Sequence, residues 1–126
     1  MIRAFCLDTS AILTLRDDEP GAERVARLLE GPDPCFITRM EVLYWVWKDE
    51  GETRGRLADE QMQSLPIQWV DQTEPLLLEA SRIKASHSLS VADAWIAAAA
   101  LISRATLVHK DPEFEAINQL DQVWLA

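Results

Sequence analysis

Four carboxylates in this sequence lie where they could do chemistry, next to apolar runs or at the start of an apolar helix. Asp8 follows the apolar run Ile2–Leu7, and Glu41 comes shortly after a second such run. Asp93 lies in the predicted first turn of a strongly apolar helix, and Asp111 follows a further apolar run. Ligands of open parallel sheets bind beyond the carboxyl ends of the strands. We therefore expect the four acids to gather at one edge of a sheet.

Each acid also has a purely structural interpretation as a helix cap. Glu41 and Asp93 each stand three residues after a Thr or Ser, which is the spacing of a capping box. Asp8 and Asp111 have the pattern of helix N-caps. Asp71 begins another capping-box pattern, has no further support, and is interpreted as structural.

A cluster of these acids would have a large electrostatic cost. Two carboxylates ~4 Å apart repel by about 4 kcal/mol at an effective dielectric constant of 20. Such a cluster therefore needs a bound cation, or some of its members must stay protonated. Oxygen ligands suit a hard ion such as Mg²⁺ or Mn²⁺, and no cysteine or histidine is spaced for zinc. An ion of this kind favours phosphoryl chemistry, because it activates water and neutralises charge in the transition state.

Composition limits the function classes. The 126-residue chain is 48% hydrophobic, which predicts one folded domain over residues 1–126. Its net charge of −9 excludes the basic coat of a general nucleic-acid binder, so a polyanion must be held by local cations or a metal. Cys6 and Cys35 lie in apolar runs and are interpreted as buried thiols. No membrane span or secretory signal is recognisable, so we expect a cytoplasmic protein without a membrane partner.

Apolar runs of strand length alternate with helical patterns along the chain. This alternation predicts an α/β fold built of parallel β-α-β units. The expected strands are Ile2–Leu7, Cys35–Thr38, Ile67–Val70, Ala105–Val108 and Gln122–Leu125. The expected helices are Ser10–Leu15, a helix from near Pro20 to Gly31-Pro32, Met40–Glu50, Glu52–Ser64, Glu74–His87, Val91–Arg104 and a short one near Glu113–Asn118.

The helix Met40–Glu50 carries two apolar stripes. One contains Met40, Leu43, Tyr44 and Trp47, and the other contains Val42, Trp45 and Val46. Only one stripe can face the sheet, so the other needs either a second contact within the chain or a partner protein.

Four segments together resemble the signature of a known family: "FCLDTSAIL", "ITRMEV", "LSVADAWIAAAAL" and "LVHKDPEFE". In order and spacing they are similar to those of the PIN-domain ribonucleases, and in particular of the VapC-type toxins of toxin–antitoxin pairs. The resemblance implies a PIN-like three-layer sandwich, with a five-stranded parallel sheet flanked by helices. It also implies RNA hydrolysis with Mg²⁺ or Mn²⁺, a homodimer, and a cognate antitoxin that occludes the site.

Site residues follow from the same resemblance. The implied catalytic residues are Asp8, Glu41, Asp93 and Asp111. Asp8, Asp93 and Asp111 would hold the metal, and Glu41 would orient or deprotonate the attacking water. Ser10 matches a small hydroxyl position that helps to hold the first acid or the water.

Two positions depart from the family pattern. His109 stands where Ser or Thr is common, and Glu113 replaces a second Asp. Glu113 keeps the charge at a longer reach. His109 could contact the scissile phosphate or protonate the leaving group, although we interpret it as an exposed loop histidine. Arg16, Arg39 and Lys110 are candidates for guiding RNA to the acids.

Two other functions remain open at this point. A signalling receiver domain also has an α/β fold and an acidic Mg²⁺ pocket, with Asp71 as its phosphoacceptor after the third strand and Lys110 as a second site residue. That alternative needs adjacent acids after the first strand, where Asp8 stands alone, and it gives Glu41 and Asp93 no role. The other is a catalytically silent PIN-like module that only binds protein, although such a module would be expected to have lost an acid.

Overall fold

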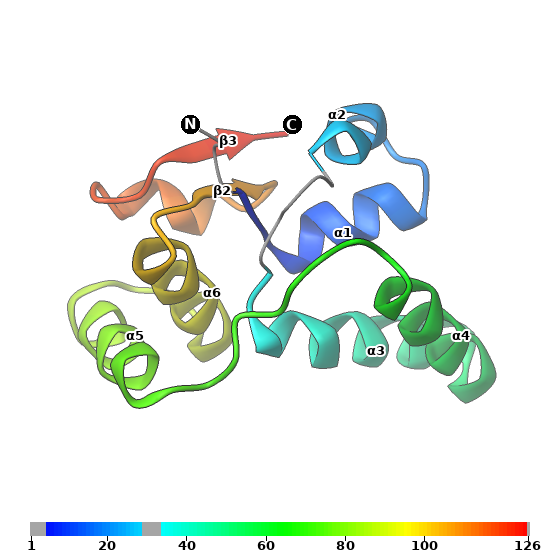
Figure 1. Ribbon diagram of the computed structural model, residues 1–126, viewed down its shortest axis with the longest axis horizontal. Coiled ribbons are helices and arrows are strands. Elements are labelled where there is room, and N and C mark those ends of the chain that lie inside the picture. Colours follow the sequence, from blue (N-terminus) through cyan, green and yellow to red (C-terminus); the bar gives the residue numbers. More distant parts are fainter. Residues whose placement is uncertain (1–4, 29–33, 126) are drawn as a thin grey trace.

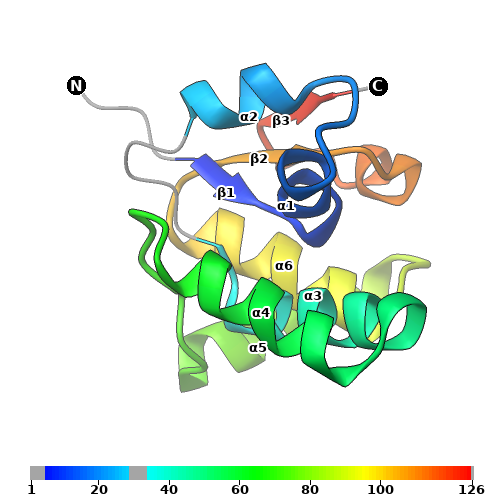
Figure 2. The same ribbon diagram turned by 90° about the vertical axis from the view of Figure 1, so that its right-hand side faces the viewer.

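The computed structural model describes residues 5–28 and 34–125. It contains a parallel sheet with helices on both faces, as Figures 1 and 2 show. The elements in chain order are β1 (Phe5–Leu7), α1 (Thr9–Arg16), α2 (Ala22–Arg27), α3 (Phe36–Glu50), α4 (Glu52–Gln63), α5 (Glu74–Ser86), α6 (Val91–Ile102), β2 (Thr106–His109), the 3₁₀ helix η1 (Pro112–Ala116) and β3 (Gln122–Trp124).

The sheet runs in the order β1-β2-β3, and both neighbouring pairs are parallel. Cys6 pairs with Leu107, and Val108 pairs with Val123. Successive residues of a strand point to opposite faces, so β1 and β2 supply one apolar layer to each side. On one face, Cys6 and Leu107 pack with buried residues of α5 and α6. On the other face, Leu7 and Val108 pack with buried residues of α1 to α4.

Helix α6 is the central helix predicted from its apolar composition. Its N-cap is Ser90, whose hydroxyl accepts a hydrogen bond from the backbone N–H of Asp93. All four alanines from Ala97 to Ala100 are fully buried, and α6 contacts β1, β2, α3 and α5. Small side chains let the helix lie close to the sheet and to its neighbours, which fixes Asp93 at the start of the helix relative to the strand ends.

The expected five-stranded sheet is wrong for the described residues, which contain three strands. The second expected strand, Cys35–Thr38, forms one isolated bridge between Cys35 and Val70, and α3 begins at the next residue. Thr38, Val42 and Val46 are the buried residues of α3 and recur every four positions, so Thr38 belongs to a helical pattern. A short apolar run does not distinguish a strand from a buried helix.

Other boundaries differ in smaller ways. The third expected strand, Ile67–Val70, is reduced to Val70 in the same bridge. The expected capping box at Asp71 is also wrong, because Thr73 is the N-cap of α5. Residues 2–4 of the first expected strand and Gly31-Pro32 lie outside the described residues. Both Cys6 and Cys35 are buried thiols, as predicted.

Within residues 5–28 and 34–125, no helix is both long and apolar enough to span a membrane.

Candidate metal and nuclease site

Asp8 connects the end of β1 to the start of α1. Its Oδ1 accepts hydrogen bonds from the backbone N–H of Ala11 at 2.9 Å and from the hydroxyl of Ser10 at 2.7 Å, which makes it the N-cap of α1. The residue is only 4% exposed. Burial, opposed by these two hydrogen bonds and reinforced by the charges of Asp111 and Glu41, raises the pKa of Asp8 to about 7. The N-cap interpretation is confirmed, and the cap is also a strongly perturbed acid.

The end of β2 lies beside the end of β1, because the two strands are parallel neighbours. Ser10 joins the two strand exits: its hydroxyl oxygen donates to Asp8 and accepts a hydrogen bond from the backbone N–H of Lys110 at 3.0 Å. The chain then turns at Asp111, whose Oδ1 accepts from the backbone N–H of Glu113 at 2.9 Å. Asp111 is therefore the N-cap of η1, as its position before a proline predicts.

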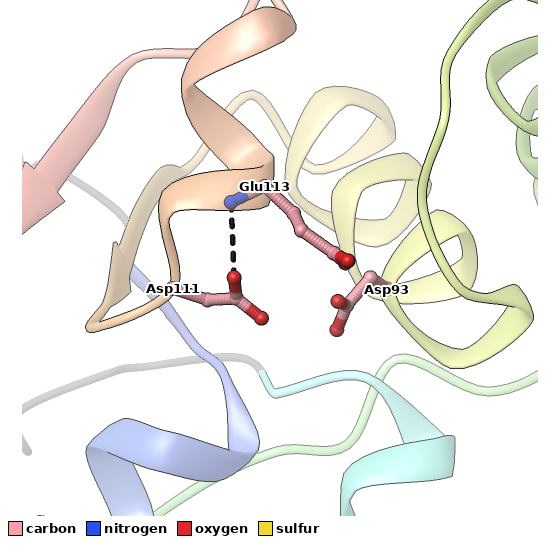
Figure 3. A group of neighbouring side chains, drawn as sticks. All are labelled: Asp93, Asp111 and Glu113. Atoms are coloured by element: carbon pink, nitrogen blue, oxygen red, sulfur yellow. Dashed lines mark hydrogen bonds between the residues drawn. The ribbon is translucent and has the colours of Figure 1, made fainter.

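Three carboxylates come together between α6 and η1. Asp93, Asp111 and Glu113 each offer an oxygen, and these atoms all lie within 4.8 Å of one another. Figure 3 shows Asp111 and Glu113 extending from the η1 segment toward Asp93 on α6. The pKa of Asp93 is raised to about 8, chiefly by burial. A hydrogen bond with the Glu113 side chain and the charges of Asp111, Glu113 and Glu41 raise it further. Such a pKa indicates that the group is costly to ionise without a cation.

Glu41 lies in the second turn of α3, where it is partly buried. The predicted capping box with Thr38 is wrong, since Thr38 lies inside the helix and its hydroxyl has no hydrogen-bond partner among the residues that the structure describes. The carboxylate instead accepts a 2.7 Å hydrogen bond from the hydroxyl of Thr9 at the start of α1. Its charge contributes to the raised pKa of both Asp8 and Asp93.

The four predicted acids therefore share one electrostatic environment at the carboxyl edge of the sheet. They arrive from four elements: the exit of β1, α3, α6 and the exit of β2. The group within mutual ligand distance contains Glu113 in place of Asp8. Asp71, the acid that was interpreted as structural, is exposed and does not belong to this group of carboxylates.

Thr9 is the residue that the sequence interpretation missed. It is 8% exposed and connects α1 to Glu41, thirty-two positions away. The available signal was a hydroxyl residue directly after Asp8, in addition to Ser10 at the next position.

His109 differs most from its prediction. It is the last residue of β2 and is fully buried, so the interpretation as an exposed loop histidine is wrong. Its two ring nitrogens are engaged by the backbone N–H of Asp111 and the side chain of Gln122, which leaves neither for a phosphate or a leaving group. Burial lowers the pKa of His109.

Two of the three cations expected to guide RNA are already paired. Arg16 forms ion pairs with Asp17 and Glu50, and Arg39 forms a two-bond pair with Asp59. Among the ion pairs of the described residues, none involves Lys110, which is partly exposed beside Asp111. Of the three, Lys110 is therefore the one that no ion pair of the described residues holds.

The donor set fits a hard divalent cation. All the candidate ligand atoms are carboxylate oxygens, and burial, followed by interactions with the neighbouring acids, raises the pKa of Asp93. Mg²⁺ and Mn²⁺ prefer oxygen ligands, and Mg²⁺ in proteins is commonly held by one or two carboxylates. The arrangement can hold such an ion beside Glu41 and the buried Asp8.

Comparison with known proteins identifies similar sequences and folds. The family model described as PIN domain matches residues 5–120. No curated protein matches the chain. DNA-bound VapBC from Salmonella typhimurium is 22% identical over 99% of this chain and 100% of the solved one, with a TM-score of 0.82. VapBC-1 from nontypeable Haemophilus influenzae is 25% identical over 97% and 98%, with a TM-score of 0.76. VapC20 from Mycobacterium tuberculosis, described as a sarcin–ricin loop cleaving toxin, is 15% identical over 90% and 95%, with a TM-score of 0.73.

Proposed function

The chain belongs to the PIN domain family, as its sequence segments predicted, and on this basis we propose that it is a metal-dependent endoribonuclease. We further propose that residues 1–126 form one such domain, and that the protein is the toxin of a toxin–antitoxin pair and works in the cytoplasm. One observation carries the proposal: acids from four separate elements meet at the carboxyl edge of the sheet, and their burial and repulsion raise the pKa values of Asp8 and Asp93. Acids with so costly an ionisation are expected at a functional site.

Each acid has a distinct task in this proposal. Asp8, Asp93 and Asp111 would hold a Mg²⁺ or Mn²⁺ ion, with Glu113 as a further oxygen ligand. Such an ion, when bound, would neutralise the carboxylates and the substrate phosphate and would favour deprotonation of water. Glu41 would orient the attacking water or accept its proton, since it lies beside the group without belonging to it.

Hydroxyl groups would hold two of these acids in place. The Thr9 hydroxyl donates to Oε1 of Glu41, so Oε2 would be the oxygen that contacts the water. Ser10 holds Asp8 and the backbone of Lys110 together. The ammonium group of Lys110 would bind an RNA phosphate near the acids, which compensates locally for the net charge of −9.

An antitoxin and a second copy of the chain are the proposed protein partners. Two of the similar solved structures are VapBC complexes, which supports an antitoxin. On α3, Val42 and Val46 are buried in the core, whereas Trp45 of the same predicted stripe is 42% exposed. Of the other stripe, Met40, Tyr44 and Trp47 are 58%, 44% and 43% exposed. The exposed stripe is available for a partner, and this supports the homodimer.

The receiver alternative has lost its structural basis. It required a phosphoacceptor after the third strand, whereas Asp71 follows an isolated bridge at Val70. A catalytically silent PIN-like module would not cleave RNA, so the cleavage assay described next distinguishes it from an active enzyme.

The decisive experiment measures cleavage of RNA by wild type, Asp8→Asn and Asp93→Asn, with Mg²⁺, with Mn²⁺ and with EDTA. We expect cleavage by the wild type only when a metal is present, and none by either variant. Asp121→Asn is the matched control. Asp121 is an exposed acid directly before β3, at the amino-terminal ends of the parallel strands, whereas the proposed site lies at their carboxyl ends. Cleavage that survives EDTA, or that both variants retain, would refute the proposal. A short reading frame directly upstream, encoding a DNA-binding protein, would support the toxin role independently.

A further inference from the structure

His109 occupies a site built around its ring. The residue is completely buried at the end of β2. Its imidazole lies 5.0 Å from the ring of Phe114 and 5.7 Å from the ring of Trp124, measured between centroids. Two aromatic neighbours, Phe114 from η1 and Trp124 from β3, therefore restrict the orientation of the ring.

The hydrogen bonds of the ring define its tautomer. Nδ1 lies 3.1 Å from the backbone N–H of Asp111, which can only donate, so Nδ1 carries no proton. Nε2 therefore carries the proton and donates to Oε1 of Gln122 at 2.9 Å. The amide nitrogen of Gln122 donates to the carbonyl oxygens of Phe114 at 2.7 Å and Ile117 at 3.3 Å. Every donor in this chain of bonds meets an acceptor.

These bonds hold both ends of one short segment. His109 binds its first residue, Asp111, through the backbone N–H, while Gln122 binds carbonyls at Phe114 and at the C-cap of η1. The segment between these points carries two of the three carboxylates that converge in Figure 3. The neighbouring strand β3, which supplies Gln122, is thereby connected to the acidic group without contributing a ligand.

We propose that His109 and Gln122 are positioning residues, which hold Asp111 and Glu113 at the distance from Asp93 that a divalent cation requires. The inference rests on the proposed function, because it assumes that these carboxylates bind the ion. Neither residue touches the reacting atoms. Groups that orient metal ligands through hydrogen bonds typically contribute 10- to 100-fold to metal affinity.

The test measures Mn²⁺ binding directly, by titration with detection of free Mn²⁺, in wild type and three variants. His109→Gln loses the acceptor for Asp111, and Gln122→Met keeps a similar volume but loses all three hydrogen bonds. We expect both to bind Mn²⁺ 10- to 100-fold more weakly than wild type. His109→Asn can place its amide oxygen near the position of Nδ1, so it should recover part of the affinity.

The control separates positioning from loss of stability. Ile83→Val shortens a fully buried side chain on α5, outside the acidic group, and should lower stability without changing Mn²⁺ affinity. Equal Mn²⁺ affinity in wild type, His109→Gln and Gln122→Met would overturn this inference alone. A wild type that binds no Mn²⁺ would overturn the proposed function and this inference with it.

The tautomer of His109 can be measured in the wild type, so this second test does not depend on the folding of any variant. The ¹⁵N chemical shifts of His109 should report the tautomer protonated on Nε2, with the Asp111 amide protected from hydrogen exchange. Protonation of Nδ1 would overturn the proposal, because the ring could not then accept a hydrogen bond from Asp111.

Discussion

Asp8→Asn should abolish the proposed metal site and yet stabilise the metal-free protein at neutral and alkaline pH. The asparagine oxygen can still accept the hydrogen bonds from Ser10 and Ala11, so the N-cap of α1 is retained. The substitution removes the charge of the Asp8 carboxylate, which is only 4% exposed and is repelled by Asp111 and Glu41. Stability and function are therefore expected to respond in opposite directions.

The magnitude follows from the pKa of Asp8. It is raised from the ordinary value of 3.8 to about 7 in the folded protein. Between these values the folded state binds more protons than the unfolded chain, so the free energy of unfolding falls as the pH rises. The difference of about 3 pH units, at about 1.4 kcal/mol each, gives a cost of about 4 kcal/mol once the pH exceeds 7. This cost vanishes in Asp8→Asn.

The assay is urea unfolding in EDTA, for wild type and variant, at pH 4 and at pH 8. The stability advantage of Asp8→Asn should grow by about 3 kcal/mol between the two conditions, because the wild-type carboxyl is protonated when folded at pH 4. Adding Mn²⁺ at about 100 times its Kd should then stabilise the wild type by about 2.7 kcal/mol and leave the variant unchanged.

Asp121→Asn provides the reference for the loss of an exposed acid. The same measurements on this variant give the baseline for removing a carboxyl group that is exposed to solvent, at the far edge of the sheet. An advantage of Asp8→Asn that stays constant from pH 4 to pH 8 would refute the reasoning. Asp8 would then ionise as an ordinary carboxyl, without the burial and repulsion on which the proposed site depends.

Three further substitutions test separate contacts. Thr9→Val, which removes the hydrogen bond to Glu41, should lower kcat/KM on RNA about 10-fold or more, whereas Thr9→Ser should retain activity. Lys110→Ala should weaken RNA binding and reduce the slope of log K against log salt by about 1, measured by titration over a range of KCl concentrations. Gly55→Leu should lower the free energy of urea unfolding by about 1–3 kcal/mol, although leucine favours helices, because a Cβ at Gly55 would lie 3.2 Å from backbone atoms of Trp47.

Much of the fold could be predicted because its elements carry strong local signals. The alternation of strand-length apolar runs with helical patterns predicted the α/β class. The almost entirely apolar composition of Val91–Ile102 identified the central helix. The sheet was overestimated because Cys35 and Val70 lie in apolar runs of strand length yet form a single bridge. The residues after Cys35 join the buried stripe of α3, and this tertiary packing decides the structure of an ambiguous run.

The convergence of the four acids could be predicted, but their hydrogen-bond partners could not. Local sequence places Asp8 and Asp111 at strand exits, and the parallel order of β1 and β2 then brings them to one edge. The hydrogen bond between Thr9 and Glu41 spans thirty-two positions, and the contact of His109 with Gln122 spans thirteen. Contacts of this kind depend on the angles between packed elements, for which a single sequence carries no periodic signal.

Capping and catalysis need not be alternative explanations of these acids. Asp8 caps α1 and Asp111 caps η1, and each cap uses Oδ1. A carboxylate has a second oxygen and further lone pairs, so a cap fixes the side chain and leaves it able to bind an ion. A cap alone could be made by Ser, Thr or Asn without a buried charge. The presence of Asp at a position where ionisation is costly is therefore better explained by a ligand than by the helix it begins. The stability advantage of Asp8→Asn in EDTA, compared with the stabilisation of the wild type alone by Mn²⁺, tests this distinction directly.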